Sequence, residues 1–203
     1  MGELRSDIDG NRTVHLCLDM QRLFGPEGPW ATPWLERVMP AVIGLVERAP
    51  CRTVFTRFIP PASPDEASGM WRSYFRKWRL VTREVVDPHL LELMAPLQRH
   101  VPPAIVFDKA AYSAFSNSGL HDFLRGRGVD TLIITGAETD VCVLSTILSA
   151  VDLGYRIIVA KDGLCSSADE THDALLGLYA KRFDLQIEMA ECAGILACWS
   201  PPS

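Results

Sequence analysis

Short apolar segments alternate with amphipathic segments along almost the whole of this chain of 203 residues. The short segments are rich in valine, isoleucine and threonine and are continuously apolar, which indicates strands covered on both faces. Strands are expected at Val14–Leu18, Thr53–Phe58, Ala104–Phe107, Thr131–Thr135, Arg156–Ala160 and, with a weaker pattern, Leu185–Met189. Helices are expected at 34–48, 87–98, 118–126, 140–153 and 169–182, with a last one near 191–198.

This alternation predicts an α/β fold in which βαβ units build a mainly parallel, six-stranded central sheet. Helices on both faces would give a three-layer, Rossmann-like α/β/α arrangement, and we expect one domain over residues 1–203. Residues 1–12 are polar and are expected to form a loose leader. Residues 60–83 begin with the loop-like string PPASPDEASG and continue with aromatic residues, which predicts a lid-like insertion.

The charge and the apolar pattern of the sequence limit the kinds of molecule with which this protein is expected to interact. The formal charge of −5 and the absence of a basic cluster argue against a nucleic-acid surface. The N-terminal residues lack a signal-peptide pattern and no stretch has the apolar length of a membrane span. We therefore expect a cytoplasmic protein whose six cysteines are reduced thiols, acting on a small molecule. The cysteines and histidines lack metal-ligand spacing, so we expect no metal and no other cofactor.

Three reactive side chains follow predicted strands. Asp19 ends the string LCLD, Lys109 ends VFDK, and Cys142 follows ITGAETDV. The carboxyl ends of parallel strands share one edge of a sheet, where open α/β sheets bind ligands. We therefore expect an acid, an amine and a thiol to meet there, a combination that favours nucleophilic catalysis by cysteine.

The helix expected from Asp140 strengthens this interpretation. Thr139 or Asp140 is a suitable N-cap, which would place the thiol in the first turn, at the positive end of the helix dipole. This position, and Lys109 if its strand neighbours the strand before Cys142, would favour the thiolate. Asp19 would take up the thiol proton and later deliver it to a leaving amine. Backbone N–H groups of Cys142 and of Glu138 or Thr139 would stabilise an oxyanion.

The strings LCLDMQRLF, FDKAAYSAF and ITGAETDVCVLSTILSAVDLGYRIIVAKDGLCSS resemble the isochorismatase-like cysteine hydrolase superfamily, over about residues 13–190. The resemblance implies the fold of that family and a catalytic triad of Asp19, Lys109 and Cys142. It also implies a cis peptide bond between Ala137 and Glu138, which turns backbone amides into the oxyanion hole. A homodimer or homotetramer is implied as well.

One departure narrows the branch of that family. Its nicotinamidases carry an Asp…His…His zinc site after the second strand, whereas this chain has no histidine between His15 and His89. The resemblance therefore favours the metal-independent amidohydrolase branch. Of the remaining histidines, His172 lies beside Glu170 and Asp173 and is expected on a solvated helix face.

The function predicted is hydrolysis of a C–N bond in a small amide, ureide or carbamoyl substrate, through an acyl-thioester at Cys142. One alternative is an isochorismatase-type vinyl-ether hydrolase that uses Asp19 as acid. Another is a non-catalytic protein that binds a small molecule or senses redox state. Arg57 is suited to a substrate carboxylate or, equally, to a surface ion pair. The candidates for substrate binding are Phe24, Arg57, Trp71, Tyr112 and Phe115.

Overall fold

Six strands form one sheet in the order β3-β2-β1-β4-β5-β6, and every neighbouring pair is parallel. The computed structural model describes residues 4–200. The prediction of a six-stranded, mainly parallel sheet is confirmed. The strands are β1 Thr13–Leu18, β2 Thr53–Phe58, β3 Ile105–Lys109, β4 Thr131–Ala137, β5 Arg156–Cys165 and β6 Ile187–Ala190.

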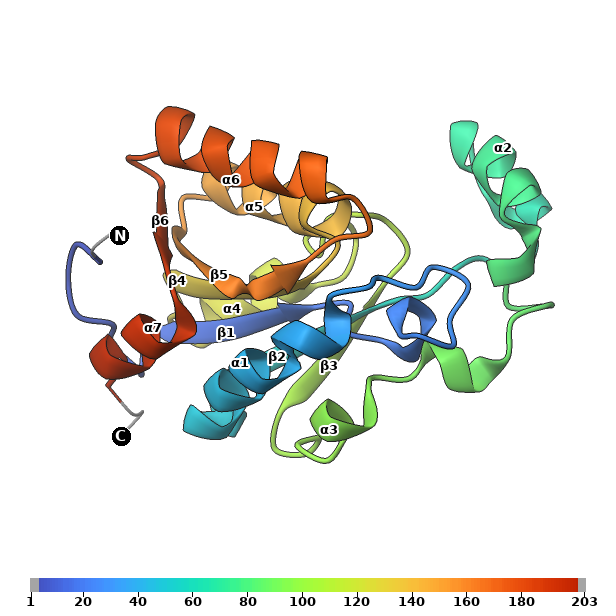
Figure 1. Cartoon of the computed structure of the whole chain (residues 1–203). Helices are drawn as coiled ribbons and strands as arrows, with labels where there is room; N and C mark the ends of the chain where they lie inside the picture. Colours follow the sequence, from blue (N-terminus) through green and yellow to red (C-terminus); the bar gives the residue numbers. More distant parts are fainter. Residues whose placement is uncertain (1–3, 201–203) are drawn as a thin grey trace.

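Helices cover both faces of this sheet, as predicted (Figure 1). Apolar residues of α4, α5 and α6 pack on one face, and those of α1, α3 and α7 pack on the other. The central strands β1 and β4 are buried along their whole length, which suits their largely apolar sequences. The helices are α1 Leu35–Arg48, α2 Met70–Lys77, α3 Ala95–Gln98, α4 Leu120–Gly126, α5 Leu144–Asp152, α6 Asp169–Arg182 and α7 Cys192–Cys198.

The helix predicted over 87–98 is wrong. This stretch holds a 3-10 turn at Pro88–Leu91 and only the single turn of α3. The intervening backbone is extended, because Leu93 forms an antiparallel bridge with Gln21. Proline at the start of each turn favours this interruption, since it supplies no N–H to a continuous helix.

The predicted loose leader is also wrong for its described part, residues 4–12. The side chain of Ile8 is completely buried and packs against Trp199 in the same core cluster. The backbone N–H of Ile8 donates to the carbonyl of Cys198, and its own carbonyl accepts from Ser200. The two ends of the domain are thus joined, and residues 1–3 lie outside the described residues.

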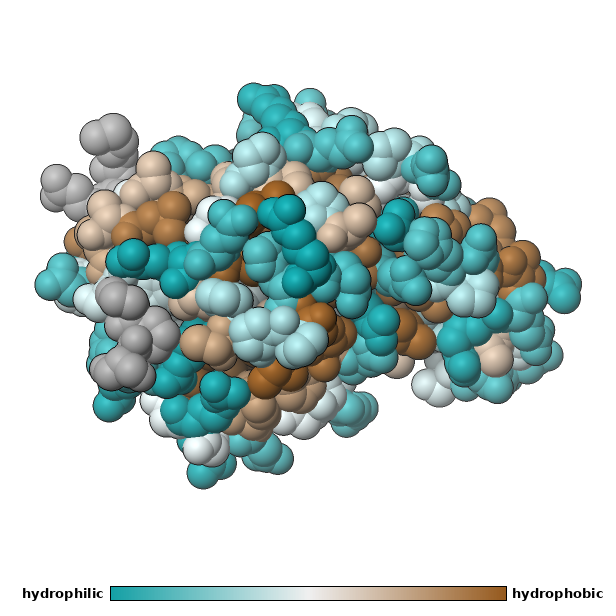
Figure 2. Space-filling view, turned by 90° about the horizontal axis from the view of Figure 1, so that it is seen from below, coloured by the Kyte–Doolittle hydropathy of each residue, from teal (hydrophilic) through white to brown (hydrophobic). Residues whose placement is uncertain are grey.

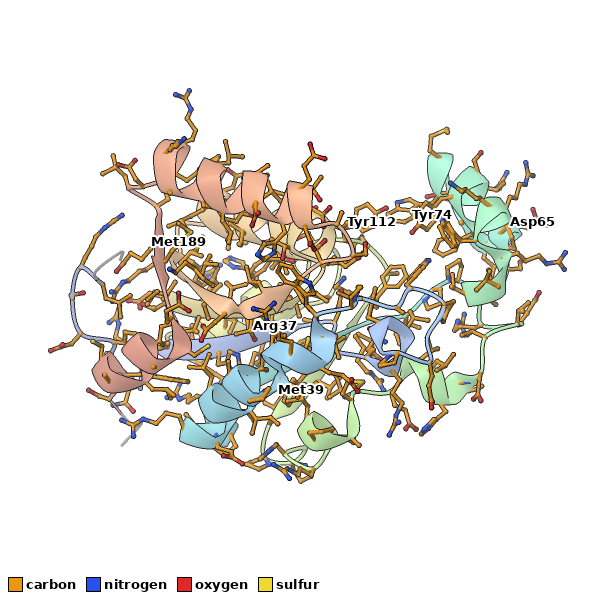
Figure 3. The ribbon with its side chains drawn as sticks, viewed as in Figure 1. Arg37, Met39, Asp65, Tyr74, Tyr112 and Met189 are labelled. Atoms are coloured by element: carbon orange, nitrogen blue, oxygen red, sulfur yellow. The ribbon has the colours of Figure 1, made fainter. Side chains whose placement is uncertain are left out.

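Residues 60–83 form a segment that projects from the rest of the fold (Figure 1), and its role as a lid stays a prediction. The segment contains α2 between two 3-10 turns, Pro64–Glu66 and Arg79–Val81. Helix α2 stands apart from the helices that cover the sheet (Figure 1). Tyr74 of α2 lies side by side with Tyr112 of the loop after β3 (Figure 3). The segment therefore covers the edge of the sheet rather than one of its faces.

The face that carries α1 and α7 is largely hydrophilic, with smaller hydrophobic areas between (Figure 2). Among residues 4–200, no helix combines the length and the apolarity needed to cross a bilayer.

His15 makes the stability of the fold depend on pH. Its ring is fully buried in β1, contacts Thr135 Oγ1 through Nε2 at 2.8 Å, and burial lowers its pKa from 6.5 to about 3. Between about pH 3 and pH 6.5, His15 therefore binds a proton in the unfolded chain but not in the folded chain. The stability contributed by neutral His15 is complete above about pH 6.5 and is lost as the pH falls toward 3. At pH 5 we expect a loss of about 2 kcal/mol in the free energy of unfolding.

Urea unfolding of the wild type and of His15→Gln, each at about pH 7.5 and about pH 5, checks this prediction. The wild type should lose about 2 kcal/mol more than the variant on acidification. An equal loss in both proteins would show that His15 does not titrate on unfolding.

Candidate active site

The strand order reverses direction between β1 and β4, and two of the predicted residues flank this point. Asp19 follows β1 directly, and Cys142 lies in a π-helical turn, Thr139–Val143, between β4 and α5. Lys109 is the last residue of β3, two strands away from β1. The condition stated for its influence on the thiol, a strand that neighbours β4, is therefore not met. The lysine reaches the site nevertheless, because its long side chain extends past the end of β2.

The structure brings the acid, the amine and the thiol together. Nζ of Lys109 lies 2.6 Å from Oδ2 of Asp19 and 3.4 Å from Sγ of Cys142, and donates to the carbonyl of Ala111 at 3.0 Å. All three side chains are buried, with exposed fractions of 0%, 3% and 5% for Asp19, Lys109 and Cys142. Thr56 Oγ1 donates to Asp19 Oδ1 at 2.6 Å. Oδ2 therefore remains as the oxygen available to exchange a proton.

A glycine lets β1 and β4 approach closely at this point. A Cβ added to Gly136 would lie 2.0 Å from the backbone oxygen of Leu18, and Gly136 has a φ of +116°. Asp19 itself adopts a positive φ of 50°, which is uncommon for a residue with a side chain. The peptide bond between Ala137 and Glu138 is cis. The turn that carries Cys142 therefore begins immediately beside Asp19.

The predicted capping of this turn is wrong, although Cys142 does lie in the first turn. The N-cap is Glu138, and no side chain caps the backbone. The Thr139 hydroxyl donates to the carbonyl of Cys165 and contacts His172 Nδ1 at 2.8 Å. The Asp140 carboxylate accepts from two hydroxyl groups of the loop and helix that follow β5. His172 is therefore buried as a support for the turn, and its expected place on a solvated face is wrong.

Burial changes the expected electrostatics of the thiol. Desolvation and the carboxylate of Asp19 raise the pKa of Cys142, and Lys109 opposes this rise only in part. The lowered pKa expected from the helix terminus is therefore wrong for this structure. Desolvation lowers the pKa of Lys109, but the neighbouring Asp19 and Cys142 more than offset it, so that its pKa is raised overall. Lys109 is thus an ammonium ion, while Cys142 holds its proton.

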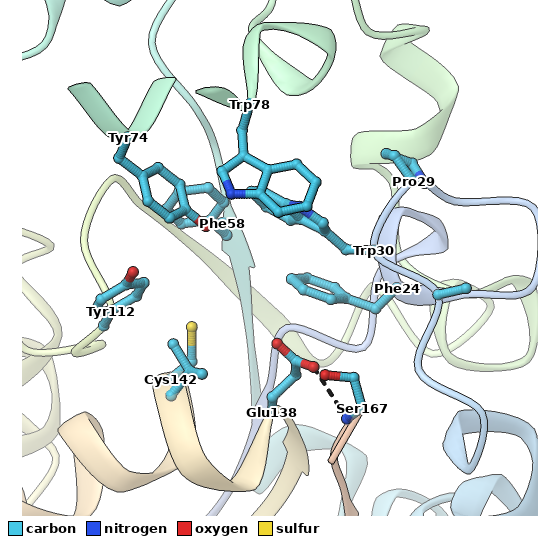
Figure 4. A pocket seen from close by; sticks show the side chains of 12 residues that line it. Phe24, Pro29, Trp30, Phe58, Tyr74, Trp78, Tyr112, Glu138, Cys142 and Ser167 are labelled. Atoms are coloured by element: carbon cyan, nitrogen blue, oxygen red, sulfur yellow. Dashed lines mark hydrogen bonds between the residues drawn. The ribbon is translucent and has the colours of Figure 1, made fainter. Parts of the chain in front are cut away.

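Cys142 opens into a cavity of about 350 Å³ with aromatic walls (Figure 4). The Trp30 ring lies at the centre of these walls, 5.9 Å from Phe24, 5.8 Å from Trp78 and 6.3 Å from Tyr74 between ring centroids. The cavity is lined by Phe24, Pro29, Trp30, Ala31, Phe58, Tyr74, Trp78, Tyr112, Glu138, Val141, Cys142 and Ser167. This is the small apolar pocket with few polar groups that is typical of ligand sites.

The structure brings only some of the predicted substrate-binding residues to this cavity. Phe24 and Tyr112 line it. Trp71 packs behind Tyr112, at 4.8 Å between ring centroids, and lines a neighbouring cavity instead. Arg57 forms a bidentate ion pair with Asp108, with N–O distances of 2.8 and 2.9 Å, so the ion-pair interpretation holds. Phe115 stacks on Tyr155 in the core of the opposite face.

Sequence reasoning missed Trp30 and Phe58. Phe58 is the last residue of β2, so the strand-end argument that identified Asp19 and Lys109 applied to it as well. Trp30 lies in the loop 25–34, which has no periodicity from which its orientation could be predicted. Glu138 was considered for its backbone only, whereas its side chain also lines the cavity.

Comparison with known proteins agrees with this arrangement. Residues 13–191 match the isochorismatase domain family. A ureidoacrylate amidohydrolase (RutB) of Methylorubrum extorquens is 30% identical over 191 residues, covering 82% of this chain and 72% of that protein. An uncharacterized isochorismatase family protein (PncA) of Bacillus subtilis is 35% identical over 88 residues, only 43% of this chain and 48% of that protein. A cysteine hydrolase structure from Pseudomonas syringae pv. phaseolicola superimposes with a TM-score of 0.76, at 22% identity, covering 97% of this chain and 96% of that one. The chain belongs to the isochorismatase family of hydrolases.

Proposed function

We propose that this protein is an amidohydrolase that cleaves a C–N bond of a small amide, ureide or carbamoyl compound through an acyl-thioester at Cys142. The observation that carries this proposal is the position of Lys109 Nζ, in contact with both Asp19 and the Cys142 sulfur, beside the cavity. An amidohydrolase that acts on a ureido compound is among the relatives that cover most of this chain.

The reaction begins with transfer of the thiol proton from Cys142 to Oδ2 of Asp19. The sulfur then attacks the substrate carbonyl, and backbone N–H groups of Cys142 and Glu138 or Thr139 stabilise the oxyanion. Lys109 stabilises the thiolate as it forms. Asp19 returns its proton to the leaving nitrogen as the C–N bond breaks. A water molecule then gives a proton to Asp19 and attacks the thioester, which releases the acid and restores the thiol.

The raised pKa of Cys142 fits this sequence of steps. Because the resting sulfur is protonated, its deprotonation depends on Asp19 rather than on the solvent. Redox sensing is the weaker alternative, because oxidation requires a thiolate that burial disfavours here. For the same reason, exposed Cys51 and not Cys142 is expected to react first with a general alkylating reagent.

The cavity also argues against the isochorismatase-type alternative. Isochorismate carries two carboxylates, and among the described residues no arginine, lysine or histidine lines this cavity. Among the described residues that line the cavity, the ionisable side chains are the Cys142 thiol, two tyrosine phenols and the Glu138 carboxylate. The negative charge of Glu138 would repel a substrate that carries two carboxylates.

Acid quenching of the enzyme during turnover tests the proposal. Primary amides, ureides, carbamoyl compounds and isochorismate are each mixed with the protein, and peptide mass spectrometry locates any adduct. In the wild type we expect the peptide that contains Cys142 to gain the mass of the acyl group, and ammonia or an amine to be released. In Cys142→Ser no thioester can form, so no thioester adduct should be detected. An adduct confined to another cysteine, or turnover of isochorismate alone, would contradict the proposal.

A further inference from the structure

The cavity over Cys142 combines aromatic walls with a single carboxylate. Six of its lining side chains are aromatic: Phe24, Trp30, Phe58, Tyr74, Trp78 and Tyr112. These rings come from separate parts of the chain, and Figure 4 shows them surrounding the space above the sulfur. Aromatic faces carry partial negative charge and attract cations, so rings grouped around one space suit a cationic ligand. Two of these rings already face ammonium groups of the chain, since Lys109 Nζ lies 5.3 Å from the centroid of Phe58 and Lys77 Nζ lies 5.6 Å from that of Trp78.

The carboxylate of Glu138 is held in place without being neutralised. Its Oε1 accepts a hydrogen bond from the backbone N–H of Ser167 at 3.1 Å. Figure 4 shows this side chain beside Cys142, pointing toward the aromatic rings of the cavity. Among the described residues, no lysine, arginine or histidine forms an ion pair with Glu138. The neighbouring Lys109 is already paired with Asp19, so its charge is largely balanced.

A ligand in this cavity therefore contacts aromatic faces and a negative charge. Among residues 4–200, no cationic side chain lines the cavity. A substrate carboxylate would lose its hydration without gaining a partner, which is unfavourable. A substituted ammonium group would gain cation–π contacts and the attraction of Glu138.

We propose that the substrate carries a cationic group, such as a substituted ammonium, close to the scissile amide, and that the aromatic walls and Glu138 select it. This inference rests on the proposed function, because it assigns the substrate class of the same cavity. The carboxylate of Glu138 would attract the positive charge of the substrate. The backbone of Glu138 begins the turn that holds Cys142.

Comparing three ligands of similar size but different charge shows whether the cavity selects the charge of the substrate or only its shape. Betaine amide carries a trimethylammonium group, 3,3-dimethylbutanamide is its uncharged isostere, and malonamate carries a carboxylate. Binding of each to Cys142→Ala, which has no nucleophile, is measured by calorimetry at fixed ionic strength. We expect the Kd of betaine amide to be lower than that of the neutral isostere by about 10-fold or more. Equal affinity for the two, or tighter binding of malonamate, would overturn the inference.

Glu138→Gln in the same background tests the carboxylate itself. Glutamine keeps an oxygen that accepts from the Ser167 N–H, so the change removes charge and preserves the contact. The Kd of betaine amide should rise by about 5-fold or more, while that of the neutral isostere changes by less than about 2-fold. Glu47→Gln is the matched control, because Glu47 is an exposed carboxylate near the C-terminal end of α1, where it pairs with Arg99. An equal effect of both substitutions would contradict a local role of Glu138.

Turnover by the wild type keeps the two proposals distinguishable. Hydrolysis through Cys142 without preference for cationic amides would uphold the function and refute the cation site. Tight binding of betaine amide without any Cys142-dependent hydrolysis of the amide panel would uphold the cation site and refute the function.

Discussion

Replacing Cys142 with alanine is expected to abolish amide hydrolysis, with a loss in kcat/KM of at least about 10⁴-fold. Among the described lining residues, its sulfur is the atom best suited to attack a carbonyl, and it lies between the cavity and Lys109. Without it, a water molecule would have to attack the amide directly, and the stepwise route through a thioester is lost. The measurement is release of ammonia or amine from the best substrate of the amide panel.

The matched control is Cys51→Ala, the same substitution at an exposed cysteine. It should leave kcat/KM within about 2-fold of the wild type, since surface substitutions away from special features have small effects. Circular dichroism and the thermal midpoint should show that Cys142→Ala is folded. Full turnover in the folded Cys142→Ala variant would show that another group performs the chemistry.

The positions of the catalytic candidates were predictable because they depend on topology alone. In a parallel sheet every carboxyl end lies at the same edge, so residues that follow strands converge whatever their separation in sequence. This argument placed Asp19, Lys109 and Cys142 correctly and applied equally to Phe58. It needed neither the strand order nor the register.

Features that depend on register or on loop conformation were not predictable in the same way. Arg57 lies directly across from Asp108 in the β2–β3 register, and this alignment commits the guanidinium to an ion pair rather than to a ligand. Trp30 reaches the wall of the cavity from a loop, where no periodicity fixes a direction.

The ionisation of the thiol was mispredicted for an electrostatic reason. The sequence shows that Cys142 starts a helix, which favours a thiolate, but it does not show that the sulfur-bearing residue is 5% exposed. It also does not show that the Asp19 carboxylate approaches closely enough to oppose ionisation. Burial of the thiol and the negative charge of Asp19 outweigh the single ammonium of Lys109.

Asp19→Asn is expected to lower kcat/KM by about 10²- to 10⁴-fold, the usual contribution of general acid–base catalysis. Asparagine has nearly the same shape and still offers an acceptor to the Thr56 hydroxyl, but it cannot take the thiol proton. The same substitution removes one cause of the raised thiol pKa, because the Asp19 charge raises the pKa of Cys142. The thiol should therefore ionise at lower pH in the variant, even though the enzyme turns over more slowly.

These opposite effects separate a general base from a residue that only holds the fold together. The pH dependence of alkylation by iodoacetamide, followed by mass spectrometry on the peptide that contains Cys142, reports the pKa of Cys142, and kcat/KM reports catalysis. Asp108→Asn is the matched control, since it removes an exposed carboxylate next to Lys109 in sequence without touching the thiol. It should leave both quantities nearly unchanged. If Asp19→Asn raised the pKa of the thiol, or left kcat/KM intact, Asp19 would not be the group that accepts the proton of Cys142.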